Sequence, residues 1–132
     1  ADVRRIAGAQ AELMSDESPH RFDILPLLVA TDGAIAAFGL DGRRLRPNLV
    51  IGGVEGLDER SWPGRRLRIG SVVVYLDSLR GRCIMTTFDP DTLEHDPAVL
   101  RDIVNRFGGK LALNAAVEHG GVITAGQSVE LY

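Results

Sequence analysis

Apolar and polar positions alternate along the chain in short segments, and this pattern predicts more strands than helices. Apolar runs bounded by turn-forming residues indicate strands at Ile24 to Ala30, Asn48 to Ile51, Arg66 to Ile69, Val72 to Leu76, Arg82 to Phe88, Leu111 to Val117, Val122 to Ala125 and Ser128 to Tyr132. The pair that flanks Gly70-Ser71 predicts a β-hairpin. A residue that precedes proline is driven toward extended geometry, so Arg46 is expected to be extended.

Two segments instead carry apolar residues at helical spacing. Residues 4–14 fit a short amphipathic helix, which a polar break at 15–19 should end. A second helix is expected to begin at Asp96-Pro97, because aspartate caps a helix N-terminus and proline suits the first helical position. Its apolar stripe runs to Phe107, and Gly108 provides the stop.

The remaining segments are turns and loops around the strands. The turn pairs Asp32-Gly33 and Asp41-Gly42 bracket the segment Ala34 to Leu40, and Gly52 to Gly64 is expected to form a long loop. Many short strands with few helices favour a mainly β fold, either a closed β-barrel or a sandwich. A length of 132 residues suits a single domain, divided into an N-terminal helix and loop (1–19) and a β core (20–132).

Charge is distributed unevenly along the chain. The net charge is −3, yet residues 43–82 contain nine arginines against four acidic residues, which gives this part +5 and the remainder −8. A basic field inside an acidic protein suits a small anion better than a nucleic acid. Arginines that alternate outward on strands are the competing explanation for most of the nine, and it applies least to Arg46 and Arg82.

Several function classes are disfavoured by what the sequence lacks. No apolar run approaches the ~18 residues of a membrane span, and a single cysteine makes a reducing, cytoplasmic setting the default expectation. The three histidines share no zinc-site spacing, and the acidic stretch 89–96 resembles a solvated turn more than a calcium loop. Nucleotide-binding glycine motifs are absent. The only lysine, Lys110, follows two glycines, so this chain alone is not expected to bind pyridoxal phosphate.

Cys83 is the candidate for chemistry. Arg80 and Arg82 lie within three residues of it and should favour the thiolate, the form that binds soft metals or attacks electrophiles. Thr86 and Thr87 could donate hydrogen bonds to a phosphate or carboxylate. A buried structural cysteine in a strand explains the same residues about as well.

These segments resemble a known domain family. Arg46-Pro47-Asn48-Leu49-Val50-Ile51, followed by Leu67-Arg68-Ile69-Gly70 and by Arg82-Cys83-Ile84-Met85-Thr86-Thr87-Phe88-Asp89-Pro90, is similar to the MOSC domain, the C-terminal domain of molybdenum cofactor sulfurases. The same domain occurs in the mitochondrial amidoxime-reducing component. The resemblance covers about residues 20–132 and implies a closed β-barrel of the pyruvate-kinase type with a few peripheral helices.

The resemblance also implies roles for particular residues. Cys83 matches a cysteine that carries sulfur as a persulfide or ligates molybdenum. Positions that hold the pterin and its phosphate in molybdenum cofactor are matched by Arg46, Asn48 and Arg82, and a segment lining the same pocket by Thr31 and Asp32. Many relatives have a second cysteine where this chain has Arg80, and a serine after the Thr-Asp pair where it has Ala34.

Three functions follow as expectations. The domain binds molybdenum cofactor with Cys83 as metal ligand and reduces N-hydroxylated compounds, using electrons from a separate electron-transfer protein. Alternatively, Cys83 carries a persulfide received from a cysteine desulfurase, a separate enzyme that depends on pyridoxal phosphate. The third is a non-catalytic module that binds an anion or cofactor and has lost the family's chemistry.

Overall fold

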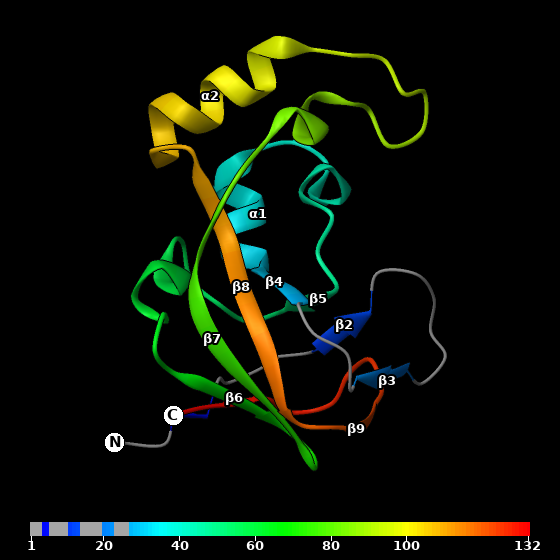
Figure 1. Ribbon diagram of the computed structural model, residues 1–132, viewed down its shortest axis with the longest axis vertical. Helices are drawn as coiled ribbons and strands as arrows, with labels where there is room; N and C mark the ends of the chain where they lie inside the picture. The colour runs from blue at the N-terminus through cyan, green and yellow to red at the C-terminus, as the bar shows by residue number, and fades with distance from the viewer. Residues whose placement is uncertain (1–3, 6–10, 14–19, 23–26) are drawn as a thin grey trace.

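A curled antiparallel and parallel sheet forms the body of the protein in the computed structural model (Figure 1). The structure describes residues 4–5, 11–13, 20–22 and 27–132. Ten strands are present among them: β1 (Arg4–Arg5), β2 (Ala11–Leu13), β3 (His20–Phe22), β4 (Leu27–Thr31), β5 (Leu49–Ile51), β6 (Arg66–Ile69), β7 (Val72–Gly81), β8 (Lys110–His119), β9 (Gly121–Ile123) and β10 (Glu130–Leu131). The helices are α1 (Asp32–Phe38) and α2 (Pro97–Phe107), with 3-10 turns η1 (Gly42–Leu45), η2 (Asp58–Ser61) and η3 (Ile84–Thr87).

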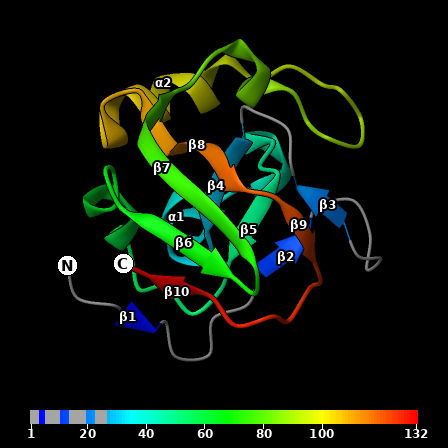
Figure 2. The ribbon, with the colours of Figure 1, turned by 60° about the horizontal axis from the view of Figure 1, so that its bottom comes forward.

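Eight strands form one sheet in the order β1-β10-β6-β7-β8-β4-β5-β2, and β3 pairs with β9 in a small second sheet. Only β4 and β5 run parallel, with Val29 opposite Leu49 and Thr31 opposite Ile51. Within the described residues, the edge strands β1 and β2 do not pair with each other. The expected closed barrel is therefore wrong: the sheet is curled, with α1 and α2 beside it, but open (Figure 2).

The N-terminal helix expected at 4–14 is also wrong where the structure describes that segment. Arg4 and Arg5 pair with β10, and Ala11 to Leu13 pair with β5. Strands of two or three residues have little preference of their own, so the partner strand decides their conformation. The predicted polar break at 15–19 lies outside the described residues.

Three local expectations in the middle of the chain are corrected as well. Asp32-Gly33 is the first turn of α1, because the Thr31 hydroxyl accepts the Ala34 N–H at 3.2 Å and caps a helix there. Arg46 has a left-handed backbone conformation, with φ 56° and ψ 46°, because it closes η1 by donating its N–H to the Arg43 carbonyl. Beyond Cys83 the chain forms η3 instead of a strand.

The hairpin of β6 and β7 and the closing strands β8, β9 and β10 confirm the remaining β predictions. The predicted helix is α2, which begins after Asp96 and ends at Gly108, whose φ of 65° is left-handed. Its buried residues Val99, Ile103 and Phe107 pack with α1 and Leu111 in a cluster separate from the main sheet core. The larger cluster lies inside the curled sheet and includes the fully buried Trp62.

The cap at Asp96 gives a first prediction. Its carboxylate accepts the Ala98 N–H at 3.0 Å, one of the N–H groups that a helix leaves unpaired. Asp96→Ala should lower the free energy of unfolding by about 1 kcal/mol. Urea unfolding measures the change, with Glu94→Ala, an exposed acidic residue two positions before the cap, as the comparison; equal losses in both variants would show that the cap contributes nothing.

Candidate functional site around Cys83

Cys83 lies where the long β7–β8 pair ends. Gly81 is the last residue of β7 and pairs with Lys110, and the Arg82 N–H donates to the Gly109 carbonyl at 2.8 Å. The chain then leaves the sheet for η3 and α2 before it returns as β8, so residues 83–107 form a separate layer at one end of the sheet (Figure 1). The end of the strand pair therefore fixes the position of Cys83.

The Cys83 backbone is extended and caps η3, while its side chain is exposed. Its carbonyl accepts both the N–H of Thr86 at 3.1 Å and the Thr86 hydroxyl at 2.8 Å. The Thr87 hydroxyl donates to the Ile84 carbonyl at 2.5 Å. Thr86 and Thr87 are buried, and their hydroxyl protons are used inside this turn. Both threonines thus hold the segment that presents Cys83, and they do not offer free donors to a ligand.

Arg82 is the most unusual residue of the site. One of its terminal nitrogens donates to the Leu45 carbonyl, whereas Nε and Nη1 are buried and have no hydrogen-bond partner among the described residues. Burial, more than the neighbouring Arg80 cation, lowers the pKa of Arg82 to about 10, so it remains charged near neutral pH. Buried donors without acceptors are rare in folded proteins and call for an explanation such as an absent ligand.

Arg82 also joins two segments that are far apart in the sequence. Its bond to Leu45 places it at η1, directly before Arg46. The Arg46 side chain is exposed, and within the described part of the chain it has no hydrogen-bond or ion-pair partner. The structure therefore places the backbone of Arg46 near Arg82 and Cys83; a shared role of the three residues in binding a cofactor stays a prediction.

Asn48 has a structural contact that leaves part of its amide available. Its Oδ1 accepts the Leu28 N–H at 2.8 Å, and its own N–H donates to the Leu28 carbonyl at 2.8 Å. This pair of bonds extends the parallel ladder of β4 and β5 by one step. No described residue accepts a hydrogen bond from the Asn48 Nδ2 group, which remains a donor for a ligand.

Thr31 and Asp32 lie at the C-terminal end of β4 and form hydrogen bonds with the segment that follows β5. The Asp32 carboxylate accepts the N–H groups of Gly53 and Val54 at 2.8 and 2.9 Å. Thr31 is fully buried, and its hydroxyl donates to Glu59 at 2.8 Å. These contacts hold the loop after β5; a contact of Thr31 or Asp32 with a cofactor stays a prediction.

Glu59 is a residue that sequence reasoning missed. It is fully buried in η2 and accepts hydrogen bonds from the N–H and hydroxyl of Thr31 and, at 2.9 Å, from the N–H of Ala112. Burial raises its pKa, although these hydrogen bonds oppose the shift. Its charge in turn favours the charged form of Arg82. No local pattern marks it, because Glu59 stands in a loop among other acidic residues.

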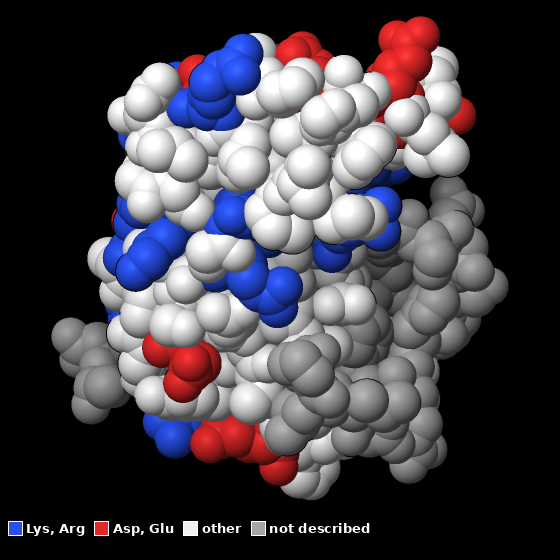
Figure 3. Space-filling view, turned by 45° about the horizontal axis from the view of Figure 1, so that its top comes forward, with Lys and Arg blue, Asp and Glu red and all other residues white. Residues whose placement is uncertain are grey.

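Most of the remaining central arginines have ordinary partners. Arg43 pairs with Asp41 and Asp91, Arg66 with Glu118, and Arg68 with Glu130. Arg60 donates to two backbone carbonyls, and Arg80 to Asn114. Figure 3 shows basic side chains in a band across the face that carries α2 and η3, with acidic side chains toward its margins. Arg44 lies 3.6 Å from the Asp89 carboxylate. Six of the nine arginines are therefore paired, and Arg46, Arg65 and Arg82 are left; of these three, only Arg82 has buried nitrogens without a partner among the described residues.

The acidic stretch 89–96 has its own local structure. The Asp89 carboxylate accepts the N–H groups of Asp91 and Thr92 at 2.8 and 2.9 Å, and these bonds lower its pKa. His95 stacks on Phe88 at 5.0 Å between ring centroids. In the described part of the chain, no three His, Cys, Asp or Glu side chains gather as a metal site. Nor does any helix described here have the length and apolarity to cross a membrane.

The sequence matches a known domain family over most of its length. The family model described as MOSC domain matches residues 28–130, and the chain belongs to this family. Human mitochondrial amidoxime reducing component 2 is 37% identical over 76 residues, which are 53% of this chain and 22% of that protein. Molybdenum cofactor sulfurase 2 of Culex quinquefasciatus is 34% identical over 76 residues, 58% of this chain and 10% of that protein. The matched region thus spans less than a quarter of these relatives.

Solved structures agree on the fold. YiiM from Geobacillus stearothermophilus superposes with a TM-score of 0.67 at 11% identity, covering 99% of this chain and 75% of that one. The YUAD protein from Bacillus subtilis gives 0.60 at 18% identity, covering 80% and 62%. At such low identity the likeness concerns the arrangement of strands and helices alone.

Proposed function

We propose that this chain binds molybdenum cofactor beside Cys83 and reduces N-hydroxylated compounds with electrons from a separate electron-transfer protein. The observation that carries the proposal is Arg82, a charged guanidinium with two buried donors unpaired among the described residues, directly before the exposed Cys83. A phosphate or pterin oxygen would satisfy those donors, because guanidinium groups bind such oxygens in a paired geometry. One relative is named for molybdenum cofactor and another for the reduction of amidoximes, which are N-hydroxylated compounds.

Each residue has a role that its environment permits. Arg82 would hold an anionic group of the cofactor, while Arg46 and the free Nδ2 group of Asn48 would add contacts on the side of η1 and β5. The Cys83 thiolate would ligate molybdenum, since soft metals prefer thiolate ligands. When bound, the cofactor supplies a metal centre that accepts electrons and passes them to the substrate. The electron-transfer protein is a second partner of the domain.

The test is metal and pterin analysis of the protein purified from a host that makes the cofactor. We expect near-stoichiometric molybdenum and pterin. Cys83→Ser should lower molybdenum several-fold but retain pterin, because the arginine contacts remain. Wild-type protein without molybdenum and pterin would refute cofactor binding by this chain.

The exposure of Cys83 supports a second candidate, sulfur transfer. A cysteine desulfurase, which carries the pyridoxal phosphate, would present a persulfide; the Cys83 thiolate would take its outer sulfur and release the desulfurase cysteine as a thiolate. Mass spectrometry should then find about 32 Da added to Cys83, and no addition to Cys83→Ser. A chain that never gains this mass with an active desulfurase excludes the candidate.

A non-catalytic anion-binding module is the alternative that both tests also address. It predicts that Cys83→Ala leaves ligand binding intact and that Arg82→Ala weakens it. If molybdenum and the persulfide are both absent but an anion still binds through Arg82, the module has lost the family's chemistry.

A further inference from the structure

The side chain of Arg60 connects the end of α2 to the start of β8. Its Nη1 donates to the Lys110 carbonyl at 2.8 Å, and its Nη2 donates to the Phe107 carbonyl at 3.0 Å. Phe107 is the last residue of α2, where a helix leaves carbonyl groups unpaired and where the helix dipole favours a cation. These two hydrogen bonds of one guanidinium are called the Arg60 bridge.

The Arg60 bridge spans two glycines. Gly108 and Gly109, the residues between the two carbonyls, have φ angles of 65° and 78°, in the left-handed region. Glycine restricts the backbone less than any other residue does, so a connection of two glycines is flexible unless other contacts hold it. The bridge therefore holds the part of the connection that has the least stiffness of its own.

The same connection is the backbone partner of the proposed site. The Arg82 N–H donates to the Gly109 carbonyl at 2.8 Å, and Gly81 pairs with Lys110. Cys83 follows directly, where the chain leaves the sheet for η3. A displacement of Gly109 would therefore move the backbone of both Arg82 and Cys83.

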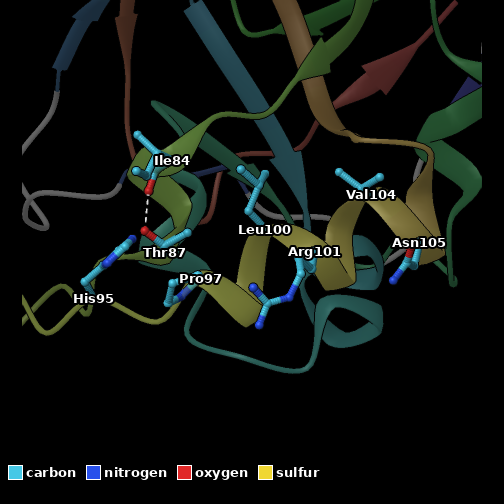
Figure 4. Close-up of a pocket in the computed structure, with 8 residues that line it drawn as sticks. All are labelled: Ile84, Thr87, His95, Pro97, Leu100, Arg101, Val104 and Asn105. Atoms are coloured by element: carbon cyan, nitrogen blue, oxygen red, sulfur yellow. Dashed lines mark hydrogen bonds between the residues drawn. The ribbon is translucent and has the colours of Figure 1, made fainter.

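The helix that the bridge holds also lies against the turn that follows Cys83. Figure 4 shows Ile84 of η3 together with Leu100 and Val104 of α2 among the residues that line one groove. A displacement of α2 would therefore also move the turn that presents Cys83. The end of α2 thus affects Cys83 from both sides along the chain.

Arg60 projects from a base that is itself held in the interior. Its neighbour Glu59 is fully buried, and the Glu59 carboxylate accepts the Ala112 N–H at 2.9 Å. Ala112 has a φ of 68°, which is uncommon for a residue other than glycine and needs contacts that hold it. The consecutive residues Glu59 and Arg60 thus hold both ends of the segment 107–112.

We infer that Arg60 is a positioning residue of the proposed cofactor site. By holding residues 107–110, it keeps Gly109 in place as the acceptor of the Arg82 N–H, and so keeps Arg82 and Cys83 in the geometry that binds the cofactor. Both terminal nitrogens of Arg60 donate to backbone carbonyls, so it acts through Gly109 and not as a ligand. The consequence for the cofactor rests on the proposed function, whereas the bridge can be tested without it.

Backbone order parameters from ¹⁵N relaxation test the bridge on protein that holds no cofactor. Arg60→Met keeps the length of the side chain and removes both donors. The order parameters of Gly109 and Arg82 should then fall from about 0.85, the value of a rigid backbone, toward about 0.6. Leu76, in the middle of β7, donates its N–H to the Arg65 carbonyl and should keep the rigid value. A loss of overall stability leaves the order parameters of the folded state unchanged, so this readout separates positioning from a merely structural role.

Arg60→Lys and Arg106→Met complete the test. Lysine keeps the charge but lacks the planar fork that reaches two carbonyls, so a smaller fall is expected. Arg106 likewise donates to two carbonyls at the end of a helix, those of Ala37 and Phe38 in α1, and its loss should leave the connection between α2 and β8 rigid. Unchanged order parameters in Arg60→Met, or an equal fall in Arg106→Met, would overturn the role of the bridge.

Cofactor retention connects the bridge to the proposed function. Protein from a host that makes the cofactor is dialysed, and the molybdenum and pterin that remain are measured over time. Arg60→Met should lose both at least about tenfold faster than the wild type and Arg106→Met, the factor expected when one hydrogen bond to a charged group is lost. Equal retention by all three proteins refutes the positioning role alone. Wild-type protein without cofactor refutes the proposed function, while the order parameters still decide whether Arg60 holds Arg82.

Discussion

Arg82→Met is expected to abolish retention of molybdenum cofactor without weakening the fold. The guanidinium has a single hydrogen-bond acceptor within the described structure, the Leu45 carbonyl, and two buried nitrogens without partners. Hydrogen bonds to a charged group contribute about 1.5–3 kcal/mol each. Losing two such bonds to the cofactor would weaken its binding by roughly 100-fold or more.

Although Arg82→Met should lose the cofactor, its free energy of unfolding should stay the same or rise. A buried cation without a counter-ion costs free energy, as its lowered pKa of about 10 reflects, with burial as the main cause. Replacing such a group by an apolar side chain of similar length is often neutral or stabilising, so we expect a change between zero and a gain of about 1 kcal/mol. Urea unfolding and cofactor content are measured on the same preparations.

Arg68→Met provides the comparison. Arg68 lies on β6 and pairs with Glu130 at the surface, so its loss should change neither cofactor content nor stability by more than about 0.5 kcal/mol. Arg82→Met protein that keeps its cofactor but unfolds several kcal/mol more easily would show that Arg82 is a structural residue. That result would remove the main support for the proposed function.

Glu59→Leu is expected to lower the free energy of unfolding by about 2–6 kcal/mol, the cost of two buried donors that lose their acceptor. The carboxylate accepts three hydrogen bonds in the interior, and leucine would leave the N–H groups of Thr31 and Ala112 unpaired. Each unpaired buried donor costs about 1–3 kcal/mol. Small domains are stable by only about 5–15 kcal/mol, so much of the fold's stability is at stake.

Glu59→Gln tests the charge of the same group. The amide keeps an acceptor for Thr31 but turns an NH₂ group toward the Ala112 N–H, which should cost about 1–3 kcal/mol. Burial raises the pKa of Glu59, so the folded state holds this proton more tightly than the unfolded state does. The stabilisation is present below the unfolded pKa near 4.5 and is lost as pH rises through the folded pKa. The glutamine variant should lose this pH dependence.

Glu55→Leu controls for removing an acid from the same loop. Glu55 is exposed, and its loss should change the free energy of unfolding by no more than about 0.5 kcal/mol. Urea unfolding at several pH values above 4.5 compares the four proteins. A Glu59→Leu variant as stable as Glu55→Leu would show that the buried hydrogen bonds add no net stability.

Sequence reasoning succeeded where short-range contacts decide the structure. Asp96, Pro97 and Gly108 bound α2 because a cap, a fixed φ angle and a left-handed stop act within a few residues. The β6–β7 hairpin follows from a turn at Gly70, whose φ is 59°. Sequence reasoning failed at Arg46 and beyond Cys83, where 3-10 turns closed by hydrogen bonds override the preference for extended backbone.

The sequence by itself determined the family, the strand-rich composition, α2 and the choice of Arg46, Arg82 and Cys83 as candidates, since these depend on residue identity and local spacing. Tertiary structure alone decided that the sheet stays open and that residues 4–5 and 11–13 become strands, because strand pairing joins segments distant in the chain. Only the tertiary structure buries Glu59, whose carboxylate accepts hydrogen bonds from Thr31 and Ala112. It also left two Arg82 nitrogens without partners among the described residues, because burial and hydrogen bonding across the fold are not encoded at any single position.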